Sequence, residues 1–380
     1  MTKPVRVLHA VVNMNRGGAE TLIMNLYKNI NRKEIQFDFL TSFEGAYDEE
    51  IRKLGGRIYR IPSIREGHTK YLNTLDSFFT AHPYKIVHAH MDKLSGNILE
   101  RAKMAGVPVR IAHSHNTMSE GNTVMKLYKW NIGKKIKDSS THQIACSKEA
   151  GQWLFPDNTS YLLLTNSINT GDFLFDRMQR RRIRTALGLT EKHTLFGTVG
   201  RLQPQKNQKY LIKRFAAVYQ QNKKARLIII GDGPLKEELQ LLAENLRIDK
   251  AVIFTGIRKE IPAFLHAMDV FCFPSLHEGM PVSVIEAQAA GLYCILSDVI
   301  TRDVDIGAGL CNYLALKETS SWENEMLRAR SRGDARRSPK IDAGIKSFDA
   351  AESARVLENF YVGRERELRY GKINDIYSHV

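Results

Sequence analysis

The chain has 380 residues, of which 43% are hydrophobic and 26% charged, a composition typical of a globular protein with two domains of ordinary size. No apolar run approaches the roughly 20 residues of a membrane-spanning helix, the first eight residues lack a signal-peptide pattern, and the dispersed cysteines fit neither a zinc-ligand spacing nor a disulfide framework. The formal net charge of +15 predicts an anionic partner: a phosphorylated substrate, a nucleic acid or an acidic membrane surface.

The first part of the chain alternates short apolar runs with helical patterns. Residues 5–12 predict a strand, residues 13–20 a loop and residues 21–29 a helix. Further strands are predicted at residues 37–40, 57–61, 86–90 and 109–113, with helical stretches between them. Alternating strands and helices favour a parallel α/β sheet.

The same alternation starts again after a polar, turn-rich linker at residues 165–173. Strands are predicted at residues 194–199, 226–230, 252–255, 270–273 and 293–297. Helices are predicted at residues 180–187, from 210, at 234–246 and at 282–290, followed by a loop at 333–339 and a helix at 349–361. The chain therefore contains two α/β halves.

The most informative motif is FPSLHEGMPVSVIEAQAAG at residues 273–291, where a strand ends, a loop follows and a helix opens. The loop and the helix start contain Glu278, Gly279, Met280, Pro281 and Val282. Glycine lets a ligand approach the backbone, proline suits a helix start, and free N–H groups there would face a phosphate or a sugar hydroxyl. Glu278 and Glu286 can touch different parts of one elongated ligand; the alternative is an ordinary helix cap with one buried acid.

The second motif is GRLQPQKN at residues 200–207, directly after a predicted strand. Arg201 and Lys206 would project from one loop, where two cations stabilise the negative charge that gathers on a diphosphate leaving group. Taken alone, the motif is also compatible with a solvated basic loop.

The third motif is NRGGAE at residues 15–20, between the first strand and the first helix. Gly17 and Gly18 permit a tight turn, but the motif is not the G-x-G-x-x-G fingerprint of dinucleotide binding. The alternative is a simple strand-to-helix turn.

Four histidines lie at the ends of two predicted strands: His88, His90, His113 and His115. Strand ends form the ligand crevice of an open α/β sheet. A metal site is disfavoured because no cysteine or paired carboxylate lies nearby. The remaining alternative is a set of core histidines bonded to the backbone, which we prefer for His88.

Together these motifs resemble the group 1, glycogen synthase-like family of retaining glycosyltransferases, and most closely its bacterial exopolysaccharide and capsule transferases of the EpsF kind. The resemblance covers nearly the whole chain. It implies the GT-B fold, an α/β arrangement of two Rossmann-like domains facing each other across a cleft. Residues 1–165 would form the acceptor domain, residues 174–348 the donor domain, and a C-terminal helix within about 349–380 would cross back onto the first.

The resemblance also implies roles for the motif residues. In the family, the first glutamate contacts the donor sugar and the second the nucleotide ribose, which assigns these roles to Glu278 and Glu286. Arg201 and Lys206 become ligands of the diphosphate. The remaining donor-side residues are Gly17, Gly18, Ile257, Arg258, Gly279, Met280, Pro281 and Val282, with Ile257 and Arg258 beside the base.

The family has one histidine that contacts the donor sugar near the reacting carbon. His115 is the best match and His113 the alternate, because a one-residue shift in the strand changes the assignment. The catalytic set is then His115, Glu278, Arg201 and Lys206. The acceptor side would include Asn15, Arg16, His90 and His113.

The implied reaction moves a sugar, with retention, from a nucleotide diphosphate sugar to a glycan or polyprenyl-diphosphate-linked acceptor. UDP is the expected nucleotide, and no metal or other cofactor is expected; the D-x-D pattern at Asp303 and Asp305 is set aside because it comes late in the chain. No nucleic-acid-binding module is recognisable. The alternatives are a non-catalytic sugar-nucleotide-binding protein and a nucleotide-sugar epimerase or hydrolase on this fold.

Residues 124–137 (VMKLYKWNIGKKIK) contain five lysines and no acid, interleaved with apolar and aromatic residues. This pattern is typical of a helix that lies on an anionic membrane surface, and equally of a solvated basic helix with one core face. Related transferases use this region to approach lipid-linked acceptors. The expectation is a cytoplasmic protein with peripheral contact at the inner face of the cell membrane.

Overall fold

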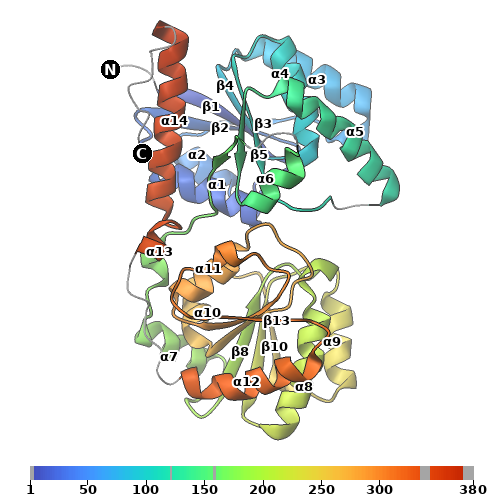
Figure 1. The fold of residues 1–380 in the computed structure, drawn as a ribbon, viewed down its shortest axis with the longest axis vertical. Coiled ribbons are helices and arrows are strands. Elements are labelled where there is room, and N and C mark those ends of the chain that lie inside the picture. The colour runs from blue at the N-terminus through green and yellow to red at the C-terminus, as the bar shows by residue number, and fades with distance from the viewer. Residues whose placement is uncertain (1–3, 120–121, 157–159, 334–342, 371–380) are drawn as a thin grey trace. The chain divides into compact units, whose positions relative to one another are not determined.

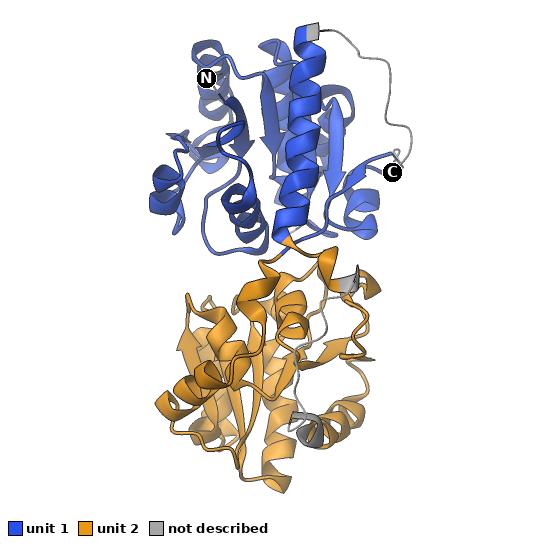
Figure 2. Ribbon diagram, turned by 90° about the vertical axis from the view of Figure 1, so that its left-hand side faces the viewer, with its two compact units in different colours: residues 1–167, 350–380 blue, residues 168–349 orange. Residues whose placement is uncertain are grey.

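The computed structural model describes residues 4–119, 122–156, 160–333 and 343–370 (Figure 1). The chain forms two compact units: unit 1 comprises residues 1–167 with 350–380, and unit 2 residues 168–349 (Figure 2). Each contains one parallel sheet with helices on both faces. This confirms the predicted α/β class with two Rossmann-like units. Among the described residues, no helix is both long enough and apolar enough to cross a membrane.

Unit 1 contains a seven-stranded parallel sheet in the order β3-β2-β1-β4-β5-β6-β7. The strands are β1 (Val5–Ala10), β2 (Ile35–Thr41), β3 (Ile58–Arg60), β4 (Ile86–Ala89), β5 (Val109–Ser114), β6 (His142–Ala145) and β7 (Leu162–Leu163). The strand order reverses between β1 and β4. Ligands of open α/β sheets bind at such switch points, outside the carboxyl ends of the strands.

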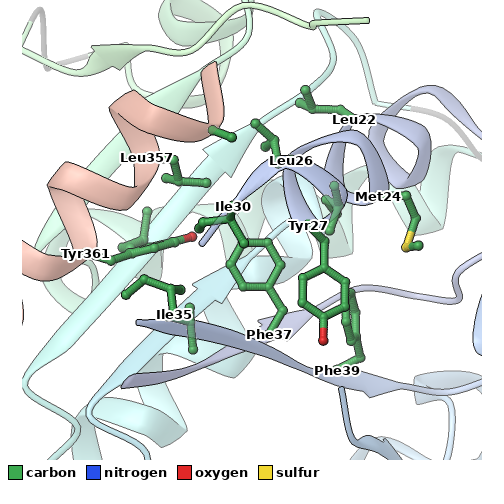
Figure 3. Close-up of a cluster of buried hydrophobic side chains, with 14 of the residues drawn as sticks. Leu22, Met24, Leu26, Tyr27, Ile30, Ile35, Phe37, Phe39, Leu357 and Tyr361 are labelled. Atoms are coloured by element: carbon green, nitrogen blue, oxygen red, sulfur yellow. The ribbon is translucent and has the colours of Figure 1, made fainter. Parts of the chain in front are cut away.

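The helices of unit 1 are α1 (Gly18–Asn29), α2 (Asp48–Lys53), α3 (His68–Ala81), α4 (Ser95–Met104), α5 (Thr123–Ser139), α6 (Lys148–Leu154) and α14 (Ala350–Tyr370). Side chains of a strand alternate between the two faces of the sheet. On one face, α1 and α14 pack over Ile35, Phe37 and Phe39, with Tyr361 reaching in from α14 (Figure 3). Helices α3, α4 and α6 pack on the other face, so both faces are buried.

Unit 2 contains a six-stranded parallel sheet in the order β10-β9-β8-β11-β12-β13. The strands are β8 (Thr194–Val199), β9 (Ala225–Ile230), β10 (Val252–Gly256), β11 (Val270–Phe273), β12 (Tyr293–Ser297) and β13 (Cys311–Leu314). The helices are α7 (Arg177–Ala186), α8 (Gln208–Gln221), α9 (Lys236–Asn245), α10 (Ile261–Ala267), α11 (Val282–Ala289), α12 (Thr319–Gly333) and α13 (Ala343–Lys346). The switch point of this sheet lies between β8 and β11.

The structure also contains elements that the sequence patterns did not predict. Strands β6, β7 and β13 are two to four residues long, too short for a distinct alternation. Helix α12 is mostly polar, and the apolar residues that it buries are separated by charged ones. Helix α1 starts at Gly18 instead of residue 21, and α14 continues to Tyr370. Most of the predicted loop at 333–339 lies outside the described residues.

Candidate active site

In unit 2, the loops after β8 and β11 meet at the switch point of the sheet. Lys206 Nζ donates a hydrogen bond to Glu278 Oε1 at 2.6 Å, and these two side chains are only 18% and 10% exposed. The ammonium group also lies 5.1 Å from the centre of the Phe273 ring. The two motifs, 72 residues apart, therefore form one charged centre.

Hydrogen bonds between the two loops fix this pairing. Asn207 has φ 53°, in the left-handed region, and its Nδ2 donates to the Pro274 carbonyl at 3.1 Å. Gln205 Nε2 donates to the His277 carbonyl at 2.8 Å, and the Leu276 N–H donates back to the Gln205 carbonyl at 2.8 Å. Asparagine tolerates the left-handed conformation better than most residues. The loop after β8 is thereby turned so that Lys206 faces the loop after β11.

Glycines bring the loops after β8, β9 and β10 into backbone contact. Gly231 has φ 138°, and a Cβ built on it would overlap the carbonyl oxygen of Gly200. A Cβ on Gly233 would overlap the backbone of Leu202. The Gly231 N–H donates to the Gly256 carbonyl at 3.0 Å. Only glycine fits these close approaches, so the three loops form one continuous edge beside Lys206.

Other predicted donor-side residues lie around this edge. Arg201 is exposed, and its carbonyl accepts a hydrogen bond from Gln208 Nε2 at 3.0 Å. Ile257 is 66% exposed after β10, and the Arg258 guanidinium lies 5.6 Å from the centre of the Phe264 ring. This arrangement leaves the Ile257 side chain open to a ligand.

Helix α11 carries the second glutamate. It begins at Val282, with Pro281 as its N-cap. The three residues that precede it in the sequence, Gly279, Met280 and Pro281, are buried. Burial raises the pKa of Glu286 to about 7. Its carboxyl group is therefore partly ionised near neutral pH and can accept hydrogen bonds from hydroxyl groups when ionised.

In unit 1, the loop after β1 contacts the loop between β2 and α2. Asn15 Oδ1 accepts a hydrogen bond from the Ala46 N–H at 3.1 Å, and the Arg16 guanidinium lies 5.7 Å from the centre of the Tyr47 ring. Gly17 is the N-cap of α1 with φ −101°, and Gly18 begins that helix without a positive φ. The chain bends at Asn15, Arg16 and Gly17 and enters α1 directly afterwards, without a positive φ at either glycine.

The histidines at the strand ends lie on the face of the sheet that α1 and α14 cover. The sequence reasoning missed His9, which pairs with His88 in the register of β1 and β4. His9 Nδ1 lies 2.9 Å from His90 Nε2, and His90 Nδ1 lies 2.9 Å from His115 Nε2. His88 Nε2 lies 3.1 Å from His113 Nδ1. A polar residue inside the apolar run of residues 5–12 was the signal that could have revealed His9.

His88 was expected to be a core histidine bonded to the backbone. It is buried, but its partners are side chains: its Nδ1 lies 2.6 Å from the Tyr361 hydroxyl, and its Nε2 faces His113. The expectation of a backbone partner is wrong because the rings on one face stand side by side along adjacent strands.

These imidazoles are held neutral. Burial lowers the pKa of His9 and of His115 to about 3. Burial, followed by the neighbouring histidines, also lowers the pKa values of His88, His90 and His113 well below the ordinary range. Two triplets bring one ligating nitrogen from each ring within 4.8 Å of one another, namely His9, His88 and His90, and His90, His113 and His115. Three histidines suffice for zinc, so the missing cysteines and carboxylates do not themselves decide against a metal.

A small pocket of about 110 Å³ lies beside His115, between the loops after β4 and β5. The backbone N–H of His115 donates a hydrogen bond to Asp92 Oδ1 at 3.1 Å. The pocket is lined by Met91, Asp92, Lys93, Asn116, Met118, Ser119, Lys129 and Trp153.

Two family models match the chain. The model described as "Glycosyl transferases group 1" matches residues 179–314, and the model described as "Glycosyltransferase Family 4" matches residues 16–156. The first range includes Lys206, Glu278 and Glu286. The second includes the histidines that follow β4 and β5.

Individual relatives cover most of the chain. EpsF of Bacillus subtilis (strain 168), whose name describes a glycosyltransferase, is 37% identical over 368 residues, covering 94% of this chain and 96% of the relative. The UDP-Gal:alpha-D-GlcNAc-diphosphoundecaprenol alpha-1,3-galactosyltransferase of Escherichia coli is 31% identical over 276 residues, covering 68% and 70%. The crystal structure of Anabaena Alr3699/HepE in complex with UDP and glucose matches with a TM-score of 0.79 at 17% identity, covering 94% of this chain and 99% of that one. That likeness establishes a shared fold.

Proposed function

The chain belongs to the group 1 glycosyltransferase family and is a glycosyltransferase of the GT-B fold, and we propose that it transfers a sugar from a UDP-sugar, with retention, to a lipid-linked or glycan acceptor. The observation that carries this proposal is the largely buried Lys206–Glu278 pair at the switch point of unit 2, with Glu286 in the adjoining helix. These groups offer a cation and two carboxyl groups to a ligand that carries phosphates and hydroxyls.

In the proposed complex, Glu286 accepts hydrogen bonds from the ribose hydroxyls, while Arg201 and Lys206 contact the diphosphate. In the structure, Glu278 balances the charge of Lys206. An incoming phosphate would take over Lys206, which frees Glu278 to accept a hydroxyl of the donor sugar. A preorganised cation in a largely buried site stabilises the departing diphosphate more than the bound donor.

The proposed mechanism assigns the chemistry to few groups. As the bond between the sugar and the phosphate breaks, negative charge develops on the diphosphate beside Arg201 and Lys206. The acceptor oxygen then attacks the anomeric carbon on the face that the diphosphate leaves, and its proton passes to a phosphate oxygen. His115 orients the sugar. Because side-chain cations supply the positive charge, we expect the reaction to need no metal.

The expected donor and acceptor follow the relatives. The name of the Escherichia coli relative gives UDP-galactose as its donor and a diphosphoundecaprenol-linked sugar as its acceptor. The HepE structure holds UDP and glucose. These names support UDP as the nucleotide and a polyprenyl-diphosphate-linked sugar as the acceptor here, in exopolysaccharide or capsule synthesis.

We further propose that α5 brings the protein to the inner face of the cell membrane. Val124, Leu127 and Trp130 are exposed at a spacing of three, which places them along one side of the helix. Lys134 stacks on Trp130, its Nζ 3.4 Å from the ring centre. Exposed apolar and basic side chains together bind anionic lipid surfaces.

Vesicle co-sedimentation tests this contact. The double substitution Leu127→Glu and Trp130→Glu should abolish binding to anionic vesicles, whereas Leu241→Glu, which changes an equally exposed leucine of unit 2, should not. Binding that survives the double substitution would contradict a role of α5.

A transfer assay tests the proposed reaction. The purified full chain would be supplied with UDP-, GDP- and ADP-sugars, a polyprenyl-diphosphate-linked sugar and EDTA, and the product's anomeric configuration determined by NMR. We expect transfer with retention from a UDP-sugar. Lys206→Ala should lower kcat by about 100- to 1,000-fold, while Lys209→Ala, which removes an exposed lysine paired with Glu238, should retain activity. An inverted product, or an epimerised or merely hydrolysed donor, would contradict the proposal.

A further inference from the structure

The pocket of about 110 Å³ beside the ends of β4 and β5, the Lys93 pocket, lies wholly within unit 1. Lys93 comes from the loop after β4, Asn116 from the loop after β5, Lys129 from α5 and Trp153 from α6. The volume is several times the space of about 10–15 Å³ that one water molecule needs, so the pocket has room for a phosphate group. The proposed donor site of unit 2 uses none of these residues.

The protein itself fixes the two loops that border the pocket. Asp92 has φ 46°, in the left-handed region that is unfavourable for residues other than glycine. Its Oδ1 accepts a hydrogen bond from the backbone N–H of His115 at 3.1 Å, which joins the loop after β4 to the end of β5. The Met91 N–H donates to Ser95 Oγ at 3.1 Å, at the start of α4. Strained residues of this kind persist where their surroundings hold them, and they are concentrated at ligand sites.

The side chain of Lys93 is held in place along its length. A Cβ built on Gly133 of α5 would lie 3.1 Å from Lys93 Cγ and 3.2 Å from Cδ, so the aliphatic stem packs closely against that helix. The ammonium nitrogen lies 5.1 Å from the centre of the Trp153 ring. Among the described residues, Lys93 has no carboxylate partner. A half-buried cation in a fixed position without a counter-ion favours the binding of an anion.

The other polar groups of the pocket fit a phosphate. Lys129 adds a second cation, and Asp92 is the one acid among the lining residues, which gives a net charge of two minus one, or +1. One oxygen of Asp92 already accepts the hydrogen bond from His115. Ser119 Oγ is buried and has no hydrogen-bond partner in the part of the chain that the structure describes. Ammonium and hydroxyl groups are strong donors to phosphate oxygens.

The rest of the lining is apolar. Met91, Met118 and Trp153 line the same pocket, and Met118 is 46% exposed. Methionine adapts its shape to flexible apolar groups, and tryptophan offers them a large contact area. Lys129 belongs to α5, whose exposed apolar side is proposed above to contact the membrane. A free phosphate has no use for this apolar wall, whereas a lipid phosphate presents its apolar chain directly beside its charge.

We propose that the Lys93 pocket binds the diphosphate end of the polyprenyl-linked acceptor, with Lys93 and Lys129 on the phosphate oxygens and the methionines and Trp153 against the first isoprene units. The choice of a polyprenyl diphosphate among lipid phosphates rests on the proposed function. These residues bind the acceptor away from the carbon that reacts, so they determine which acceptor is used and how tightly it binds.

Tryptophan fluorescence reports on this pocket directly. In the full chain carrying Trp130→Phe, two of the three tryptophans remain: Trp153 in the pocket and Trp322, which is fully buried in unit 2. We expect a saturable change on titration with farnesyl diphosphate, and much weaker responses to pyrophosphate, farnesol and dihexanoyl phosphatidylglycerol. No response to farnesyl diphosphate would overturn the proposal. An equal affinity for pyrophosphate would exclude the isoprene contact, and an equal affinity for the phosphatidylglycerol would exclude selection of the acceptor.

Substitutions test the assigned contacts in the same titration. Lys93→Gln should weaken the binding of farnesyl diphosphate by about 10- to 100-fold, because it removes a charged hydrogen-bond donor. Gly133→Ala keeps both charges and favours the helix, but it displaces the Lys93 stem and should weaken binding by a smaller factor. Lys126→Gln, an exposed lysine of α5 outside the pocket, should bind as the wild type does. Undiminished binding by Lys93→Gln would refute the assignment.

Two further measurements separate this pocket from the donor site. Lys206→Ala should keep its affinity for farnesyl diphosphate, and a loss there would place the diphosphate in unit 2 and overturn the proposal. In the transfer assay, Lys93→Gln should raise the KM for the polyprenyl-linked acceptor far more than it lowers kcat, with the KM for the UDP-sugar as in the wild type. An unchanged acceptor KM would overturn the inference and leave the proposed reaction standing. Absence of transfer by the wild type would overturn the proposed reaction, while the farnesyl diphosphate titration still decides whether the pocket binds a lipid diphosphate.

Discussion

Nucleotide-sugar binding should weaken as the pH falls below 7 because of Glu286. Burial raises the pKa of this carboxyl group from 4.5 to about 7, which favours the neutral form by on the order of 3 kcal/mol relative to a solvated glutamate. Two ribose hydroxyls that both donate need both carboxyl oxygens as acceptors, and only the ionised carboxylate offers two equivalent acceptor oxygens, so we expect binding to favour it. The apparent Kd then increases by a factor of one plus the ratio of protonated to ionised carboxyl group.

This factor gives a specific pH profile. With a pKa of about 7, the apparent Kd should be about 1.1 times its limiting value at pH 8, about twofold at pH 7 and about elevenfold at pH 6. Isothermal titration calorimetry with a UDP-sugar measures this profile. A UDP-sugar is preferred to UDP, because the terminal phosphate of UDP titrates near pH 6 itself.

Glu286→Gln supplies the matched control. The amide keeps the size of the side chain but does not ionise, so its Kd should be higher than that of the wild type at pH 8 and independent of pH between 6 and 8. A wild-type Kd that is constant across this range, or an equal slope in Glu286→Gln, would refute the reasoning.

Three stability predictions follow from the geometry, each measured by urea-induced unfolding. Gly231→Ala should lower the free energy of unfolding by about 2–3 kcal/mol, because its Cβ would overlap a backbone carbonyl at a positive φ. The control Gly188→Ala, also at a positive φ but with open space around it, should lower that free energy by about 1 kcal/mol or less. Equal losses in the two variants would contradict the overlap at Gly231. Asp269→Ala should cost about 3–5 kcal/mol, because it removes the buried carboxylate 3.2 Å from the Arg184 guanidinium and, among the described residues, leaves only the exposed Glu191, 3.9 Å away. A cost below about 1 kcal/mol would show that the buried pair is not needed. Unit 1 should lose stability as the pH falls from 6.5 towards 3, since its buried histidines stay neutral in the folded state while those of the unfolded chain take up protons. The slope should reach about 1.4 kcal/mol per pH unit for each such histidine, and constant stability between pH 7 and 5 would be incompatible with the buried, neutral array.

The sequence predicted the parts of the fold that depend on local pattern. The bounds predicted for β8, β11 and β12 are confirmed to the residue, because each is an apolar run that turn residues close on both sides. Helix α12 was missed because, among residues 319–329, its buried apolar side chains are Trp322, Met326 and Ala329, which stand between charged neighbours.

The site shows the same division between local and long-range information. The loop motifs containing Lys206 and Glu278 were recognisable from their residues, but their direct contact depends on β8 lying beside β11, which only the strand order reveals. The contacts of His9 with His90 and of Tyr361 with His88 could not be predicted from sequence, because these pairs are 81 and 273 residues apart. They depend on the register of the sheet and on the position of α14 against it.

The most direct test of the donor site is calorimetric titration of the full chain with UDP, GDP, ADP and their common sugar conjugates, using wild type, Glu286→Ala and the exposed-lysine control Lys209→Ala. The site described for unit 2 predicts micromolar binding of uridine nucleotides to wild type and to Lys209→Ala, and loss of that binding in Glu286→Ala. Absence of nucleotide binding, or undiminished binding by Glu286→Ala, would contradict the assignment of the donor site.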